Sequence, residues 1–549
     1  MRPISPIDEL ANGYVKTLAS YHPAFATNIG FPGGEAEMED YSPSAVERDL
    51  ELAKSTLADL KKLSPVDQVD EVTLDAMTRN LLSEIAMHET GLVYRDLNNI
   101  ASPAQDVRDV FDITPTETVR DWENIALRLA KVDSSLAGYS QTLEIGFEKN
   151  DGPARRQVLE VIDQVKQIVD GKFFEDFVAN AKVELPSDLK NRLQVAAKAA
   201  SAGYEKFGKF LEKMLPKSNS QDAIGRERYA ILSEKFLGAK VDLDETYEWG
   251  IAELARVVKE QEQVAHQILP GASVLEAIAH LDKDQKNKLQ SKQELKDWMQ
   301  NLSDSAIEEL GKTHFDIAAP LRKLECMIAP TQNGAIYYTG PSDDFSRPGR
   351  MWWSVPEGVT EFDTWRETTT VYHEGVPGHH LQIAQATYIR DALNDWRRLV
   401  AWTSGHGEGW ALYAERLMDE LGYLKTPADR LGMLDAQRMR AARVVLDLGV
   451  HLGKPKLSGQ GTWDFDYALE FMMANVNMPK EFVRFEVTRY FGWPGQAPAY
   501  KIGQRIWEQV RDDYKRRKGS DFDMKTFHST ALNLGGLGLD TLKLAMSKA

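Results

Sequence analysis

Apolar residues between about residue 5 and residue 310 recur three and four positions apart, with charged residues between them. This spacing places the apolar side chains on one face of an α-helix. Short breaks rich in proline, glycine or asparagine separate the segments. The pattern predicts successive amphipathic helices, of which the clearest span residues 42–63, 114–147 and 244–269. We expect the second to begin at Thr114-Pro115, with Glu117 behind this start.

The pattern changes between residues 321 and 356. The segments LRKLECMIAP, GAIYYTGP and RPGRMWWSVP are short, rich in aromatic and β-favouring residues, and bounded by proline and glycine. They predict a small β-sheet within a mostly α protein, and helices resume from residue 361 with breaks near 453–462 and 492–498. We expect residues 1–310 to wall a cleft and residues 311–549 to form the catalytic region, unless both belong to one integrated domain.

Charge and cysteine content narrow the choice of function. The chain has 66 basic and 83 acidic residues and a formal net charge of −17, so nucleic acid and anionic lipid are poor partners. Cys326 is the single cysteine, so a metal site has to use histidine and carboxylate ligands. The N-terminus lacks the apolar run of a secretory signal, and we find no apolar stretch of about 18 residues that could cross a bilayer. We therefore expect a cytoplasmic protein without a membrane partner.

Three of the eleven histidines fall within residues 373–380, in the sequence HEGVPGHH. A histidine followed by glutamate, with a further histidine beyond, is typical of zinc peptidases. Two imidazoles bind the metal, and the adjacent glutamate removes a proton from the attacking water. His373 and Glu374 are the candidates for the first ligand and the general base. The alternative is a glycine- and proline-rich helix break with surface histidines.

The second histidine ligand depends on how the helix is interrupted. His379 lies six positions after His373, which puts the two on different faces of a regular helix. Pro377 and the glycines around it indicate a widened or interrupted turn that could bring both imidazoles to one ion. His380, seven positions after His373, returns to the same helix face as His373. It lies about 10 Å from His373 along the helix axis, which is too far for one ion unless the helix bends. We favour His379 and leave His380 as its rival.

A third ligand is expected from the segment SGHGEGWALYAE, residues 404–415. Its apolar residues share one face, which predicts a buried helix with Glu408 at its start. The segment between the two motifs is long enough to return Glu408 to the metal. By itself an acidic helix start is more often a favourable interaction with the helix dipole. His406 is a weaker candidate within the same glycine-rich stretch.

These motifs support a resemblance to a known family. HEGVPGHHLQ and GEGWALYAE resemble the bacterial domain-of-unknown-function family 885. LDLGVHLGK (446–454), RYFGWPGQAPAYKIGQ (489–504) and HPAFATNIGFPG…DYSPSA (22–45) fit the same pattern. That family is similar in layout to helical gluzincin peptidases, such as carboxypeptidase Taq and the angiotensin-converting and oligopeptidase groups. The resemblance implies a large helical metallopeptidase fold with one Zn²⁺ held by His373, His379 and Glu408, and with Glu374 as the base.

Two further groups are candidates for catalysis. Asp447 and His451 lie four apart on a predicted helix, so the carboxylate could orient the imidazole towards a scissile carbonyl or a substrate carboxylate. A helix-end histidine near the dipole is the equal alternative. In the similar helical peptidases a late tyrosine donates to the oxyanion, which makes Tyr500 the candidate for that role.

Candidate substrate contacts complete the prediction. Arg489, Tyr490 or Lys501 could anchor a substrate carboxylate. The segment around Arg350 and Trp353 is expected to be an edge strand on which an extended peptide adds as another strand. The predicted function is zinc-dependent hydrolysis of short peptides. The alternatives are a metal-dependent amidase acting on a non-peptide amide and a non-catalytic binding protein of the same fold; the sequence leaves oligomeric state and exo- or endopeptidase action open.

Overall fold

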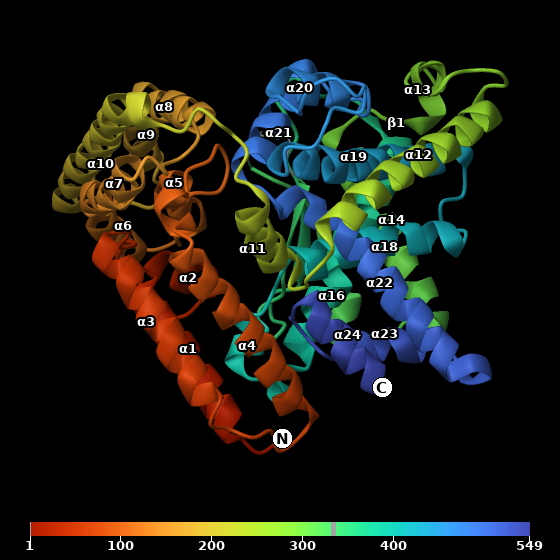
Figure 1. Cartoon of the computed structure of the whole chain (residues 1–549), viewed down its shortest axis with the longest axis horizontal. Helices are drawn as coiled ribbons and strands as arrows, with labels where there is room; N and C mark the ends of the chain where they lie inside the picture. Colours follow the sequence, from red (N-terminus) through yellow and green to blue (C-terminus); the bar gives the residue numbers. More distant parts are fainter. Residues whose placement is uncertain (1, 331–335) are drawn as a thin grey trace.

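The structure is a computed structural model that describes residues 2–330 and 336–549. Helices dominate it, in two groups that lie side by side in Figure 1. The N-terminal part contains α1 (Pro6–Tyr21), α2 (Pro23–Asn28), α3 (Pro43–Leu60), α4 (Gln68–Glu89), η1 (Leu92–Arg95), α5 (Pro103–Ile113), α6 (Val119–Leu129), α7 (Val132–Glu148), α8 (Arg155–Asp170), α9 (Phe173–Ala179), α10 (Ser187–Met214), η2 (Leu215–Lys217), α11 (Arg226–Leu237), α12 (Leu243–Ile268), α13 (Val274–Leu281), η3 (Gln285–Asn287) and α14 (Lys292–Thr313).

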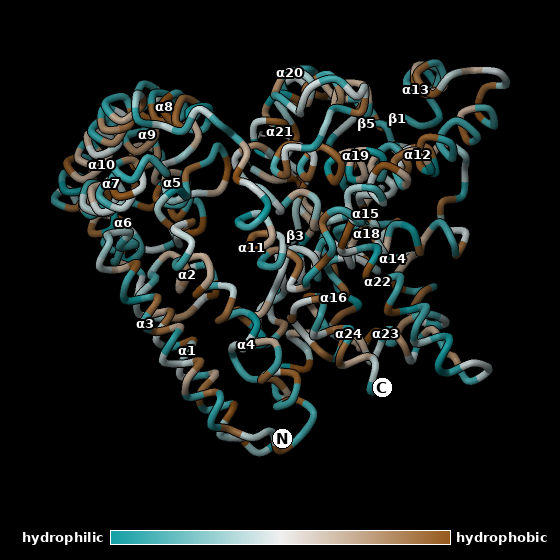
Figure 2. The backbone as a smooth tube through the Cα atoms, viewed as in Figure 1, coloured by the Kyte–Doolittle hydropathy of each residue, from teal (hydrophilic) through white to brown (hydrophobic). Residues whose placement is uncertain are grey.

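The C-terminal part, from residue 319 to residue 548, is also mostly helical. Its helices are η4 (Ala319–Arg322), α15 (Thr364–Glu374), α16 (His379–Tyr388), η5 (Arg390–Ala392), α17 (Asp395–Leu399), α18 (Ser404–Glu420), α19 (Pro427–His451), α20 (Phe465–Met473), α21 (Lys480–Gly492), α22 (Gln496–Lys518), η6 (Gly519–Asp521), α23 (Met524–Leu532) and α24 (Leu539–Lys548). In Figure 2 hydrophobic and hydrophilic residues alternate along the outer helices, as expected when each helix buries one face. No helix of residues 2–330 and 336–549 combines the length and apolarity needed to cross a membrane.

The helices predicted from residue spacing are present, with one correction. α3 and α12 occupy the predicted ranges 42–63 and 244–269. The range 114–147 contains two helices, α6 and α7, separated at Ala130-Lys131. α6 begins after Thr118, whose hydroxyl accepts from the Asp121 amide, so Thr114-Pro115 and Glu117 precede the helix. Thr118, and not Thr114, supplies the cap, because its side chain satisfies a free amide of the first turn.

The expected small sheet lies beside α15 and α16. β2 (Leu324–Ile328), β4 (Gly349–Trp353) and β3 (Ile336–Thr339) form it in that order, with β2 parallel and β3 antiparallel to β4. Residues 331–335, which were included in the sheet prediction, lie outside the described residues. β4 pairs on both sides, so the expectation that it is an edge strand is wrong. A second pair joins β1 (Lys288–Leu289) to β5 (Phe362–Asp363).

Two hydrophobic cores hold the molecule together. One is confined to residues 97–214, and the other joins residues 7–81 to residues 229–546. The division expected at residue 310 therefore does not coincide with a division of the core. The two cores are linked by polar contacts: the Gln157 amide donates to the Thr488 carbonyl at 2.8 Å, and the Asn99 amide donates to that of Phe485 at 3.3 Å. The candidate site lies entirely within the second core.

Candidate metal centre

The turn between α15 and α16 brings two histidines together. α15 ends at Glu374, and α16 starts afresh at His379 after a cis Val376–Pro377 peptide. The helix is therefore interrupted rather than widened, one of the two possibilities that the sequence left open. Gly378 is required because a Cβ there would lie 1.9 Å from the carbonyl oxygen of His373. The indole of Trp410 donates to the carbonyls of Pro377 and Gly378, at 2.9 and 3.2 Å, and so ties α18 to the turn between α15 and α16.

His373 is oriented by a carboxylate behind it. Its Nδ1 lies 2.7 Å from Oε1 of Glu415, and Oε2 of Glu415 accepts from the Thr369 hydroxyl at 2.9 Å. A carboxylate on Nδ1 fixes the tautomer that leaves Nε2 free to bind a metal. Burial lowers the pKa of His373, but hydrogen bonds to Glu408 and Glu415 outweigh it and raise that pKa to about 10. This nitrogen therefore faces strongly negative surroundings.

The structure separates His379 from its rival His380. Nε2 of His380 lies 2.8 Å from the Leu321 carbonyl and Nδ1 lies 2.9 Å from the Tyr338 hydroxyl, so both nitrogens bond to groups beside the sheet. Nε2 of His379 instead faces Glu408. Because His379 begins a new helix, its direction is no longer tied to the periodicity of α15. His379 is the second histidine of the cluster, as favoured from the sequence.

Glu408 comes from α18, which packs unusually close to α22. A Cβ at Gly409 would lie 2.5 Å from the backbone of Gly503, and one at Gly503 would lie 2.2 Å from the Gly405 carbonyl. The glycines of the motif thus permit helix contact that larger residues would prevent. α18 begins at Ser404 after the Thr403 cap, so Glu408 lies one turn inside the helix and not at its start as expected.

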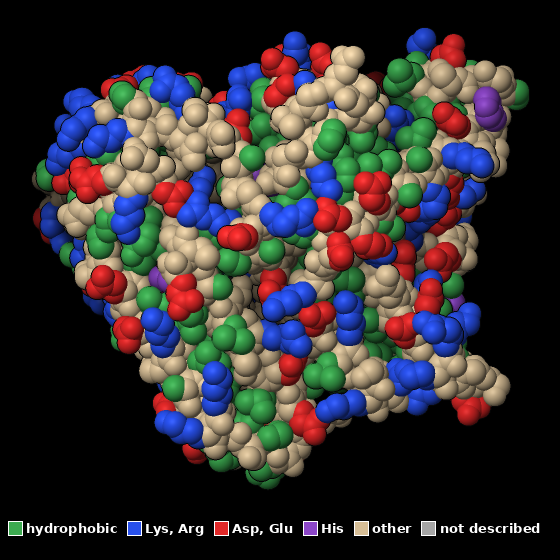
Figure 3. All heavy atoms as spheres, in the orientation of Figure 1, with side chains coloured by type: hydrophobic (Ala, Val, Ile, Leu, Met, Phe, Trp, Pro, Cys, Tyr) green, Lys and Arg blue, Asp and Glu red, His purple; other side chains and the backbone are tan. Residues whose placement is uncertain are grey.

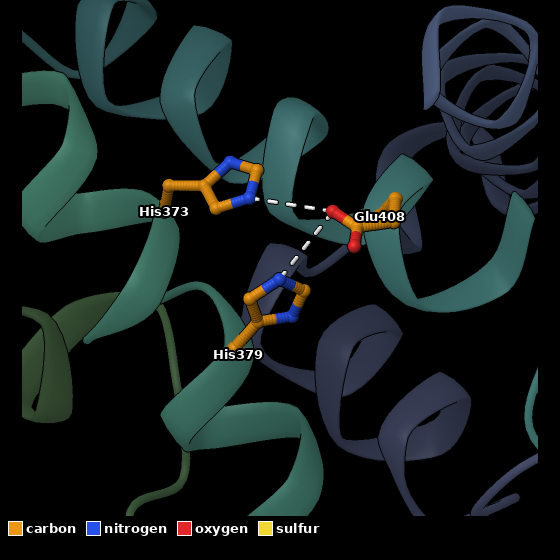
Figure 4. A group of neighbouring side chains, drawn as sticks. All are labelled: His373, His379 and Glu408. Atoms are coloured by element: carbon orange, nitrogen blue, oxygen red, sulfur yellow. Dashed lines mark ion pairs between the residues drawn. The ribbon is translucent and has the colours of Figure 1, made fainter. Parts of the chain in front are cut away.

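The three side chains converge on one point (Figure 4). Oε2 of Glu408 lies 3.4 Å from Nε2 of His373 and 3.5 Å from Nε2 of His379. All three donor atoms lie within 4.8 Å of one another. Two ligands bound to a tetrahedral Zn²⁺ at about 2.0–2.1 Å lie about 3.3–3.4 Å apart, so the two pairs with Glu408 have the spacing that an ion between them requires. The donor set fits a divalent metal ion.

Two uncommitted polar groups adjoin this cluster. Neither the Glu374 carboxylate nor the Tyr500 hydroxyl forms a hydrogen bond with any of the described residues. Burial raises the pKa of Glu374, against the positive charges of His379 and His373. Burial also raises the pKa of Tyr500, and the Glu408 charge raises it further, so the phenol keeps its proton at neutral pH. A raised carboxyl pKa and a protonated phenol suit a base and a hydrogen-bond donor.

The remaining catalytic candidate, His451, is placed differently from the prediction. The expected Asp447–His451 pair does not form: Asp447 accepts from the Tyr229 hydroxyl at 2.7 Å and the Gly495 amide at 3.0 Å. Nε2 of His451 lies 2.9 Å from the Tyr490 carbonyl, and its ring stacks on that of Tyr229. The i,i+4 spacing holds, but each side chain bonds to a group elsewhere in the chain and not to the other. His451 is therefore a packed core residue.

The predicted substrate anchors are also occupied. The Lys501 ammonium is buried, pairs with Glu253 at 2.9 Å and donates to two glutamines. Arg489 donates to Glu486 at 3.2 Å and Gln496 at 2.6 Å, and the Tyr490 hydroxyl donates to Glu486. Arg350 pairs with Glu325 at 2.7 Å. Trp353 is buried in the central strand β4, so the edge-strand reason for assigning it and Arg350 to substrate no longer applies.

Sequence reasoning missed the role of Glu415. It lies seven residues after Glu408 on α18, a spacing that puts both carboxylates on the same helix face. That spacing was the available signal. His406, the weaker ligand candidate, is buried against Trp507 with its carbonyl accepting from that indole at 3.0 Å, and it is not part of the cluster.

Comparison with known proteins agrees with the fold. The structure of a protein titled a "putative lipoprotein" from Colwellia psychrerythraea is similar over 100% of this chain and 99% of that chain, with 22% identity and a TM-score of 0.86. A second structure, titled a "putative lipoprotein of unknown function" from Shewanella oneidensis, is similar over 99% of this chain and 100% of that chain, with 16% identity and a TM-score of 0.76. Pyrococcus furiosus carboxypeptidase aligns with a TM-score of 0.39 and 11% identity, too low for the two folds to be equated.

Family comparison covers nearly the whole chain. The sequence has no match among curated proteins. The family model described as bacterial protein of unknown function (DUF885) matches residues 23–546, which include every residue of the cluster. Both the resemblance seen in the motifs and the mostly helical fold with a small sheet are thereby confirmed. The chain belongs to the DUF885 family of bacterial proteins of unknown function.

Proposed function

We propose that this protein is a zinc-dependent peptidase that binds one Zn²⁺ through His373, His379 and Glu408. The observation that carries the proposal is the convergence of two imidazoles and one carboxylate beside a buried, unbonded glutamate. Three protein ligands leave a fourth position of a tetrahedral ion open, as in catalytic zinc sites. A purely structural zinc site would be closed by a fourth side chain. When bound, zinc supplies Lewis acidity that makes water nucleophilic and polarises a carbonyl.

Three side chains around the proposed zinc site have separate roles in proton transfer, oxyanion stabilisation and ligand orientation. Glu374 accepts a proton from the water whose oxygen attacks the peptide carbonyl carbon, and then passes that proton to the leaving amine as the C–N bond breaks. The Tyr500 hydroxyl donates a hydrogen bond to the oxygen that gains negative charge. Glu415 holds His373 in the orientation that directs Nε2 to the metal. A binding protein of the same fold would have no use for the Glu374 carboxylate.

Short, unstructured peptides are the proposed substrates. A site buried within the second core is reached by an extended chain more readily than by a folded domain. Acidic and basic side chains are intermixed over the face shown in Figure 3, without a continuous basic surface for nucleic acid. A cytoplasmic location stays a prediction, because the two similar solved structures carry lipoprotein titles.

Metal content and peptide hydrolysis test the proposal together. Elemental analysis of the purified protein should find about one zinc per chain. His379→Ala should lose it, whereas His380→Gln should retain it, because His380 bonds only to Leu321 and Tyr338. The zinc-loaded protein should cleave members of a mixed peptide library, followed by mass spectrometry. Full zinc in His379→Ala would refute the ligand set, and an uncut library with zinc present would favour an amidase.

A further inference from the structure

One arginine near the proposed catalytic groups lacks a protein partner. α19 carries Arg430, Arg438, Arg440 and Arg443, and three of them are committed: Arg430 to Asp419 at 2.9 Å, Arg438 to Asn475 at 3.1 Å, and Arg443 to Glu486 at 2.7 Å. The contact found for Arg440 is a weak one to the Met439 sulfur at 3.9 Å. Within residues 2–330 and 336–549 no carboxylate pairs with Arg440, and its Nε is buried without an acceptor. A guanidinium has five donors, so this one is ready for an external acceptor.

Arg440 lies on α19, the helix that packs against α15 and carries Arg443 beside Tyr500. It is one helical turn before Arg443, whose guanidinium carbon lies 5.3 Å from the centre of the Tyr500 ring. α19 also packs against α15, the helix of His373 and Glu374, where the Thr368 hydroxyl donates to Asp429 at 3.0 Å. Burial raises the pKa of Glu374 and Tyr500, and the positive charge of Arg440 acts weakly in the opposite direction on both, as it does on Glu415 and Asp435. Arg489 and Arg443 lower the pKa of Tyr500 more than Arg440 does. The unpartnered cation thus faces the same region as the base and the phenol.

We infer that Arg440 binds the C-terminal carboxylate of the peptide, which makes the enzyme a carboxypeptidase; this inference rests on the proposed function. A carboxylate matches the planar fork of a guanidinium in two parallel hydrogen bonds, whereas the middle of a chain offers neutral amides. The anchors expected from the sequence, Arg489 and Lys501, are held by Glu486 and Glu253. In the reaction water adds to the carbonyl carbon of the last peptide bond, the C–N bond breaks, and the terminal amino acid leaves with a proton on its amine.

Binding without turnover tests the inference separately from catalysis. The probes are N-acetyl tripeptides with each natural residue at the C-terminus, prepared as free acids and as C-terminal amides. Isothermal titration uses the zinc-loaded Glu374→Gln protein, so that no peptide is consumed. The best acids should bind about ten- to a hundredfold more tightly than their amides, the range expected of hydrogen bonds to a charged group. Arg440→Gln in this background should abolish the difference, and Arg440→Lys should restore part of it.

A matched variant controls for the loss of one positive charge. Arg484→Gln, at an exposed position of α21, should keep the full acid preference. Equal binding of acids and amides, an acid preference that survives Arg440→Gln, or no binding of any probe would each overturn the inference. Equal losses for acids and amides in Arg440→Gln would assign Arg440 to positioning Glu374 or the oxyanion instead.

Product analysis distinguishes failure of the inference from failure of the proposed function. The wild-type zinc enzyme should release single amino acids from free-acid peptides, and Arg440→Gln should raise KM for these far more than it lowers kcat. Internal cleavage of acids and amides at equal rates would keep the peptidase and remove the carboxylate site. An acid preference in binding that Arg440→Gln abolishes, without hydrolysis of any peptide, would keep the carboxylate site and remove the peptidase.

Discussion

Nδ1 of His373 lies 2.7 Å from Oε1 of Glu415, which is seven positions after Glu408 on α18. The hydrogen bond sets the tautomer and the ring orientation of His373, the first proposed metal ligand. The same carboxylate is held by Thr369, which lies one turn before His373 on α15. α15 and α18 are therefore joined behind the candidate metal cluster as well as by the close approach of Glu408 to His373.

Glu415→Gln should weaken zinc binding about 10–100-fold while the protein stays folded, because an amide orients the imidazole less strongly than a carboxylate. Competition with a chromophoric chelator measures the affinity. Glu420→Gln, on the same helix but paired at the surface with Arg511, is the matched control and should leave affinity unchanged. Equal zinc affinity in Glu415→Gln and the wild type would contradict the orienting role.

Glu374→Gln should keep zinc and lose hydrolysis by about 10²–10⁴-fold, because it removes the proton acceptor but preserves the side-chain shape. The test compares turnover of the best library peptide, with zinc content measured on the same sample. Turnover at the wild-type rate in the zinc-loaded variant would exclude Glu374 as the base and support a binding protein.

Tyr500→Phe should lower kcat by about 10²–10³-fold with little change in KM, since an oxyanion donor acts mainly in the transition state. The hydroxyl has no hydrogen bond within the described part of the chain, so its removal leaves no buried group unpaired. Steady-state kinetics decide the matter. A change confined to KM would make Tyr500 a substrate contact instead.

Gly378→Ala should abolish zinc binding and lower the melting temperature, because the new Cβ would lie 1.9 Å from the His373 carbonyl oxygen. Relief of this clash has to move His373 or His379. Gly13→Ala is the control: no atom lies within 4 Å of a Cβ there, and the site is inside α1. Alanine in that helix should be neutral or stabilising by up to about 1 kcal/mol. Normal zinc content in Gly378→Ala would show that the turn tolerates a side chain.

His22 should make the stability of the N-terminal helices depend on pH. Its ring nitrogens lie 3.0 Å from Glu39 and 3.2 Å from Asp49, and although burial lowers its pKa, the two carboxylates raise it to about 9. A raised folded-state pKa gives stability that is complete below the unfolded value of about 6.5 and is lost as pH rises through about 9. Urea unfolding should therefore separate His22→Gln from the wild type more at pH 6 than at pH 10. The exposed His266→Gln should show no such trend, and a gap for His22→Gln that stays constant with pH would refute the pairing.

The sequence determined the helical class, the ranges of α3 and α12, the small sheet and the residues of the candidate metal cluster. Helical periodicity and β-favouring composition depend on a few neighbouring residues, so they can be recognised from the sequence without knowledge of the tertiary structure. The site residues could be predicted because zinc chemistry needs particular side chains. His373, Glu374, His379 and Glu408 all occur in two short glycine-rich motifs. The resemblance to the family then implied which of them bind the metal.

The tertiary structure alone decided which partner each polar group takes. Asp447 accepts hydrogen bonds from Tyr229 and Gly495 and does not pair with His451. Lys501 forms an ion pair with Glu253, and β4 pairs with a strand on each side. Likewise Arg440 is distinguished from the other arginines of α19 only by lacking such a partner. Hydrogen bonds and ion pairs act over a few ångströms, and these groups are brought within that range from positions tens or hundreds of residues apart, so no local pattern encodes the choice.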